Sequence, residues 1–137
     1  MLSTISPLLH PTNRLRWQCL LLLVALVTAL RYLGSRPGIS VVFPYLPWDK
    51  LVHAVAYGGF AALARVVLGG KSGSGAVILA GVIGLLDEGM QYYSPGRSAD
   101  IRDIAADLTG AIAVVLVLIA LQALNYRRRL RLGHIPF

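Results

Sequence analysis

Four long apolar runs dominate this sequence and limit what the chain can fold into. A helix needs about 20 predominantly apolar residues to cross the hydrocarbon core of a bilayer, and it satisfies its own backbone polar groups there. Runs of this kind predict membrane-spanning helices at about residues 17–33, 51–68, 76–92 and 104–124. The sequence therefore predicts an all-α integral membrane protein, built as a four-helix bundle.

The composition agrees with this fold class and favours a single domain. Of the 137 residues, 56% are hydrophobic and 14% are charged, a balance typical of a membrane-embedded chain. We expect a cytoplasmic N-terminal segment over residues 1–16, a four-span domain over 17–124 and a basic cytoplasmic tail over 125–137. The net charge of +7 does not indicate a nucleic-acid partner, because most basic residues stand at the ends of apolar runs, where lipid headgroups lie.

The charged residues divide unevenly between the two sides of a four-span topology. One side, which holds both termini and the second loop, carries eight basic residues and no acidic one. The other side carries five basic residues and all six acidic ones. Cytoplasmic loops are enriched in Lys and Arg, so we expect both termini in the cytoplasm and the acidic side outside.

The second predicted span begins with a polar face. Asp49, His53 and Tyr57 recur every four residues, so they lie along one side of the helix. A neighbouring stripe of small residues consists of Ala54, Gly58 and Ala62. Small residues let helices approach closely in lipid, and we expect this stripe to serve packing alone.

Acids and an amide gather where the third span ends and the fourth begins. Glu88 and Gln91 are three residues apart on one helix face, and Asp87 precedes them. The segment SPGR, residues 94–97, then breaks the helix, because Pro cannot continue it and Gly permits a tight turn. A second polar stripe leads into the fourth span at positions i, i+3 and i+7: Asp100, Asp103 and Asp107.

These groups are too costly to face lipid. An ionised side chain at mid-membrane costs roughly 2.5–3.5 kcal/mol on insertion scales, so we expect them to turn inward into one pocket open to the outside. The predicted pocket consists of Asp49, Lys50, His53, Asp87, Glu88, Gln91, Arg97, Asp100, Asp103 and Asp107. The alternative is that the same groups form salt bridges that lock the bundle, a role that suits Asp87 and Asp103 best.

Carboxylates beside a histidine suit general acid–base catalysis, which makes His53 and Glu88 the candidate proton-transfer groups. Lys50 and Arg97 are candidates to hold a phosphate or a carboxylate. Oxygen-rich clusters also accept Mg²⁺ or Ca²⁺, yet no spacing here is specific for a metal. No resident cofactor is therefore predicted, while a divalent cation is compatible with the pocket.

Three segments together resemble the VanZ-like family of small bacterial membrane proteins. They are DKLVHAVAY (49–57), DEGMQYYSPGR (87–97) and DIRDIAADLTG (100–110). The family pattern is D-K-x-x-H, then D-E-x-x-Q and P-G-R, then a downstream Asp and Asn-x-x-Gly. The matching positions are Asp49, Lys50, His53, Glu88, Gln91, Pro95, Gly96, Arg97, Asp103 and Gly110. This chain departs from the pattern at Asp107, where the family usually has Asn.

The resemblance covers about residues 20 to 125 and implies a location and a phenotype. The founding member of the family is associated with resistance to the glycopeptide teicoplanin. The resemblance thus implies a multi-pass protein of the bacterial cytoplasmic membrane, whose polar site lies on the extracytoplasmic side. Its expected partners are membrane lipids and a lipid-linked cell-wall precursor or the glycopeptide itself.

Two functions remain open on the sequence. The first is binding or shielding of envelope precursors, with contacts from Asp49, Lys50, Gln91, Arg97, Asp100, Asp103 and Asp107. The second is an enzyme that acts on a lipid or a lipid-linked phosphate or acyl substrate through Glu88 and His53. A structural subunit of a larger complex is a third possibility, and the sequence fixes neither catalysis nor the oligomeric state.

Overall fold

The computed structural model describes residues 11–34, 48–93 and 100–131. These residues form four α-helices and no strand: α2 (Asn13–Gly34), α3 (Trp48–Val67), α4 (Gly73–Gln91) and α5 (Ile101–Arg131). Each of the four is long and apolar enough to cross a membrane. The prediction of an all-α membrane protein with four helices is therefore confirmed.

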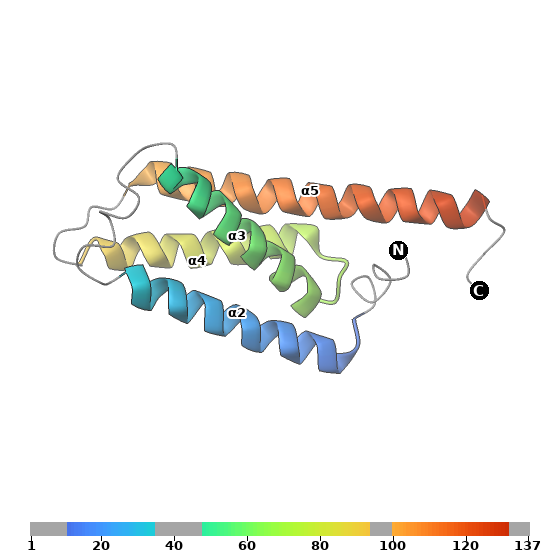
Figure 1. The fold of residues 1–137 in the computed structure, drawn as a ribbon, viewed down its shortest axis with the longest axis horizontal. Coiled ribbons are helices and arrows are strands. Elements are labelled where there is room, and N and C mark those ends of the chain that lie inside the picture. The colour runs from blue at the N-terminus through green and yellow to red at the C-terminus, as the bar shows by residue number, and fades with distance from the viewer. Residues whose placement is uncertain (1–10, 35–47, 94–99, 132–137) are drawn as a thin grey trace.

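The helices place four polar termini at the same end of the bundle (Figure 1). The carboxyl ends of α2 and α4 lie there beside the amino ends of α3 and α5, at the left of the view. We call this the polar end. At the opposite end α5 extends well beyond the other helices. As a result α3 and α5 run parallel to each other, and both start at the polar end.

Three of the helices begin at side chains that cap them. The oxygens of Thr12, Ser72 and Asp100 accept hydrogen bonds from the backbone N–H groups two or three residues further on, over 3.2, 3.2 and 2.9 Å. Such residues satisfy the free N–H groups of a first helical turn. The caps explain why α2, α4 and α5 start three or four residues earlier than the apolar runs suggested.

Of the four helix carboxyl ends, that of α5 lies furthest from the position predicted by the apolar run. The fourth apolar run stops near residue 124, whereas α5 continues to Arg131 through a segment rich in arginine. Arginine favours helix, so the helix outlasts the hydrophobic pattern. At the end of α3, Gly69 and Gly70 adopt φ angles of 88° and 80°, which turn the chain directly toward α4.

Small residues let α3 and α5 pack closely. A Cβ built on Gly110 would lie 1.9 Å from the carbonyl oxygen of Ala54, and one on Gly58 would lie 2.8 Å from Val114 Cγ2. The expected packing role of the small-residue stripe is therefore confirmed at Ala54 and Gly58. The core of the bundle, centred on α3, consists of Leu23, Tyr57, Phe60, Ala61, Ala64, Ala76, Ala80, Ala111 and Val115.

This packing predicts that Gly110→Ala will be strongly destabilising. The new methyl group would overlap the backbone of Ala54, which cannot rotate away as a flexible side chain could. We expect a loss at or above the upper end of the roughly 1–3 kcal/mol typical of overpacked cores, measured by thermal unfolding in detergent. Gly89→Ala is the matched control, because nothing lies within 4 Å of a Cβ at Gly89. Equal behaviour of the two variants would contradict the close contact.

Candidate functional site

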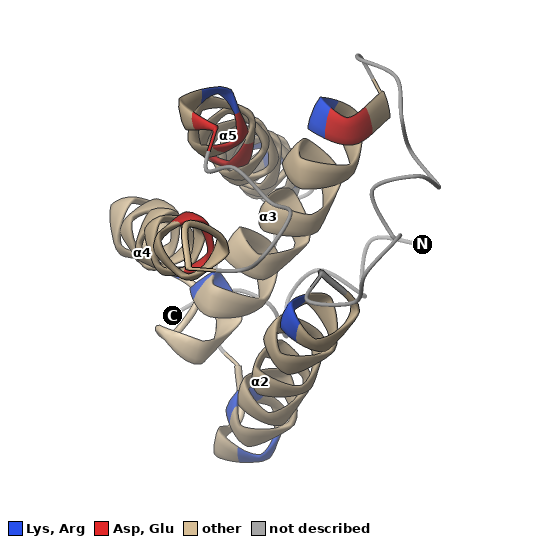
Figure 2. Cartoon of the chain, turned by 90° about the vertical axis from the view of Figure 1, so that its left-hand side faces the viewer, with Lys and Arg blue, Asp and Glu red and all other residues tan. Residues whose placement is uncertain are grey.

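The polar end brings ionisable side chains from all four helices together. Figure 2 looks onto this end and shows acidic segments at the near ends of α3, α4 and α5, with basic ones on α2, α3 and α5. All six acidic residues of the chain belong to this end: Asp49, Asp87, Glu88, Asp100, Asp103 and Asp107. Arg97 and the turn around it lie outside the described residues.

Lys50 links the start of α3 to the start of α5. Its ammonium donates to Asp49 over 3.3 Å, to Asp100 over 3.0 Å and to Asp103 at short range. The sequence suggested that Lys50 could hold an anion. In the structure its charge is instead taken up by three carboxylates, so Lys50 connects helices and has little capacity left for a phosphate.

One turn deeper, His53 pairs with Asp107. The imidazole Nδ1 lies 2.9 Å from Asp107 Oδ1, and Nε2 lies 3.9 Å from Asp103 Oδ2. Asp107 is only 1% exposed, and its second oxygen, Oδ2, has no hydrogen-bond partner among the described residues. Gly84 makes room for this oxygen, since a Cβ there would lie 2.7 Å from it. The departure from the family pattern thus supplies the carboxylate that contacts the histidine.

Glu88 is buried at the junction of α4 and α5. Its Oε2 accepts a hydrogen bond of 2.8 Å from the backbone N–H of Asp100, the residue that caps α5. Its Oε1 is buried without a partner in the described part of the chain. Glu88 therefore positions the start of α5 with one oxygen and keeps the other available for a ligand or a proton.

Arg31 is a member of the site that the sequence did not single out. Its guanidinium meets Asp87 Oδ1 at 3.1 Å, and Gln91 Nε2 donates to Asp87 Oδ2 over 2.9 Å. The salt bridge that the sequence offered as the alternative role of Asp87 is present in the structure. The available signal was a base in the last turn of α2, but nothing in the sequence tied that turn to the end of α4.

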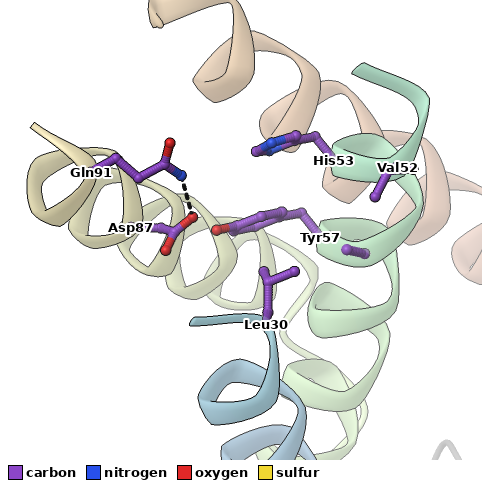
Figure 3. Close-up of a pocket in the computed structure, with 7 residues that line it drawn as sticks. Leu30, Val52, His53, Tyr57, Asp87 and Gln91 are labelled. Atoms are coloured by element: carbon purple, nitrogen blue, oxygen red, sulfur yellow. Dashed lines mark hydrogen bonds between the residues drawn. The ribbon is translucent and has the colours of Figure 1, made fainter. Parts of the chain in front are cut away.

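A small cavity of about 50 Å³ lies between these groups (Figure 3). Its lining consists of Leu30, Val52, His53, Ala56, Tyr57, Asp87 and Gln91. The Tyr57 ring stacks parallel to the His53 ring, with 6.1 Å between centroids. Figure 3 shows the Tyr57 hydroxyl directed toward Asp87 and Gln91, yet it has no hydrogen-bond partner in the described structure.

Asp100 lies at the rim of the site, just before α5. Its carboxylate accepts from the backbone N–H of Arg102 and from the Lys50 ammonium, and these contacts hold its pKa below the ordinary value for an aspartate. Because the pKa of Asp100 is lowered, its two contacts stabilise the fold fully at any pH above the pKa of Asp100 in the unfolded chain. This stabilisation is lost as the pH falls through the pKa of Asp100 in the folded state.

Among the described residues, one group of three side chains could hold a divalent cation. Asp49, His53 and Asp103 can bring one ligand atom each within 4.8 Å of one another. Carboxylate oxygens and an imidazole nitrogen suit several divalent metals. Lys50 donates to two of the same three residues, so a cation would have to compete with its ammonium.

Comparison with protein families gives this geometry a context. The family model described as VanZ/LLP1 matches residues 3–122. The chain belongs to the VanZ/LLP1 family. Searches among curated proteins and among solved structures found no match.

The family match covers every described residue of the polar end. The resemblance inferred from the three motifs is therefore confirmed. The described members of those motifs lie together: Asp49, Lys50 and His53 on α3, Glu88 and Gln91 on α4, and Asp103 on α5. Gly110, the last motif position, is the residue that allows α3 and α5 to approach.

The arrangement around Lys50 predicts that Lys50→Met will destabilise the fold. The substitution keeps an apolar chain of similar length but leaves Asp49, Asp100 and Asp103 as neighbouring negative charges. We expect a loss of roughly 1–3 kcal/mol, between the values for exposed and for buried ion pairs, measured by thermal unfolding in detergent. Lys71→Met, at an exposed lysine before α4, is the control and should change stability little. A Lys50→Met protein as stable as the control would show that the three contacts add nothing.

Proposed function

We propose that this VanZ/LLP1-family chain is a protein of the bacterial cytoplasmic membrane that binds a lipid-linked envelope precursor at its polar end and so lowers susceptibility to glycopeptides such as teicoplanin. The observation that carries the proposal is the convergence of polar side chains from four apolar helices on one end of the bundle. Ionisable groups kept within a membrane domain mark functional sites by default.

The charge distribution supports an outward-facing site. All six acidic residues lie at the polar end. The described basic side chains toward the opposite end have no acidic residue among them: Arg14, Arg16, Arg65, Lys71, Arg127, Arg128 and Arg131. Basic loops stay in the cytoplasm. The polar end would then face the envelope, where lipid-linked precursors and glycopeptides meet.

Unsatisfied polar atoms support binding over a purely structural role. Glu88 Oε1, Asp107 Oδ2 and the Tyr57 hydroxyl are buried without a partner in the described structure. Leaving such a group unpaired costs about 1–3 kcal/mol, so a bundle selected only for stability would gain by pairing or replacing them. Their presence favours a ligand or ordered water within the polar end.

Acid–base catalysis on a lipid substrate is the second candidate, and the His53–Asp107 pair favours it. A carboxylate that holds one ring nitrogen of a histidine orients the other nitrogen for proton transfer. Glu88 would supply a second proton-transfer group. An acyl substrate suits this site better than a phosphate, because Lys50 is already surrounded by carboxylates.

Glycopeptide susceptibility tests the proposal. We expect the wild type to lower the teicoplanin susceptibility of a sensitive Gram-positive host, and Glu88→Gln or His53→Asn to lose most of this effect at matched membrane levels. Lys71→Gln, remote from the polar end, should retain it. Absence of any protection by the wild type would rule out the glycopeptide role.

Asp107→Asn separates the two candidates. It restores the residue that the family usually has and keeps the side chain nearly isosteric. Binding of a precursor should tolerate it, whereas proton transfer through a His53–Asp107 pair should fall strongly, because the neutral amide no longer stabilises a protonated imidazole. The measurement is the same susceptibility assay, with membrane levels matched by immunoblot.

The sidedness has an independent test. In a Cys19→Ala background, Tyr93→Cys introduces a thiol at an exposed position of the polar end, and Lys71→Cys introduces one at the opposite end. We expect a membrane-impermeant maleimide added to intact cells to label the first and spare the second. The reverse pattern would place the polar end in the cytoplasm.

A further inference from the structure

The small cavity at the polar end has a chemical character of its own. Three of its lining groups present hydrogen-bond acceptors: the Asp87 carboxylate, the Gln91 side-chain oxygen and the Tyr57 hydroxyl oxygen. Gln91 uses its amide nitrogen to donate to Asp87, and its side-chain oxygen is an acceptor. Arg31 and Gln91 each occupy one position on Asp87, but a carboxylate has about four acceptor positions.

The Tyr57 hydroxyl is the observation that points to a ligand. Tyr57 is fully buried, its hydroxyl is directed into the cavity, and no described group bonds to it (Figure 3). A phenol retained in the core of a bundle usually finds a partner. The cavity of about 50 Å³ offers space for that partner, which has to be no larger than a small polar group.

The charges around the cavity favour a cation. Four carboxylates are buried at the polar end: Asp87, Glu88, Asp103 and Asp107. The described Arg and Lys side chains that contact them, Arg31 and Lys50, are only half-buried. A donor-rich positive group would therefore be stabilised in the cavity more than an anion would.

The walls of the cavity favour a group attached to an apolar molecule. Leu30 from α2 faces Val52 and Ala56 from α3, and Val52 is 41% exposed at the rim. Helix α2 packs chiefly against α3 rather than α4, and the cavity that its Leu30 lines is open on one side. An amphiphile could present its headgroup to Asp87 and keep its chains in the bilayer.

We infer that this cavity binds a primary ammonium group, whose N–H donors reach Asp87, Gln91 and the Tyr57 oxygen. The group can come from an aminophospholipid headgroup or from a free amine, since both present the same –NH₃⁺. The inference deepens the proposed function and rests on it, because it names the chemical class that the polar end recognises. A trimethylammonium group is excluded, since it is larger and has no N–H to donate.

Binding of defined amines tests the inference on the full-length protein. Ethanolamine and choline are titrated onto detergent-purified protein by calorimetry, and nanodiscs containing phosphatidylethanolamine or phosphatidylcholine are compared by retained lipid in native mass spectrometry. We expect ethanolamine or phosphatidylethanolamine to bind in preference to its choline counterpart. Preference in the nanodisc arm alone assigns the lipid as the source, and preference in the titration arm alone assigns a free amine. Equal retention of the amine and choline forms in both arms overturns the inference.

Tyr57→Phe and Tyr92→Phe form the matched pair of variants. Tyr57→Phe removes one oxygen that no described group bonds, so the fold should be kept, and affinity for the preferred amine should fall about tenfold through loss of a charge-assisted hydrogen bond. Tyr92 is exposed at 73%, and Tyr92→Phe should bind as the wild type does. Ala56→Leu, which fills the cavity from its apolar wall, should abolish binding without removing a polar group. Unchanged affinity in both cavity variants overturns the site.

The outcome is separable from that of the proposed function. If Tyr57→Phe loses amine binding but still protects against the glycopeptide, the cavity is not the site that recognises the precursor. The proposed function would then stand without it. Clear amine preference in a protein that gives no glycopeptide protection would support the cavity and reject that function.

Discussion

The contact between α3 and α5 determines the geometry of the polar end. The two helices are parallel, and Gly110 rests against the backbone of Ala54. This register places Lys50 beside Asp103 and His53 beside Asp107, one helical turn further along. Because the two backbones are in contact there, the side chains of α3 and α5 that lie nearer the polar end meet at hydrogen-bonding distance. A larger residue at either position would separate the helices and with them every polar pair between them.

The parallel arrangement also explains how so many acids are accommodated. Both α3 and α5 present their amino termini at the polar end, with Asp49 and Asp103 in their first turns. A helix amino terminus carries a partial positive charge that stabilises a nearby carboxylate. Lys50 adds a full positive charge between the two termini. The acidic patch is therefore a consequence of topology: two parallel helix starts, one lysine and one arginine offset much of the repulsion among six carboxylates.

Apolar runs were sufficient to predict the helices, and polar spacing was sufficient to predict that Asp49, His53, Glu88 and Asp107 lie toward one end, because both depend on local periodicity. Arg31 was missed. The start of each helix was less predictable, since caps such as Ser72 and Asp100 precede the apolar residues. Which basic side chain pairs with which carboxylate was not predictable from the sequence. Arg31 finds Asp87 only because α2 returns to the end of α4, and Lys50 is bonded to three carboxylates only in the folded register. Such pairings depend on tertiary distances, which no single segment encodes.

Asp107 limits the hydrogen bonds that the His53 imidazole can make. An ionised carboxylate only accepts hydrogen bonds, so Asp107 requires the proton of His53 to sit on Nδ1. In a neutral imidazole this leaves Nε2 as an acceptor, 3.9 Å from Asp103 Oδ2. An asparagine at the same position can donate as well as accept, and it would permit either tautomer. An ionised Asp107 therefore selects one tautomer of His53, a restriction that an asparagine would not impose.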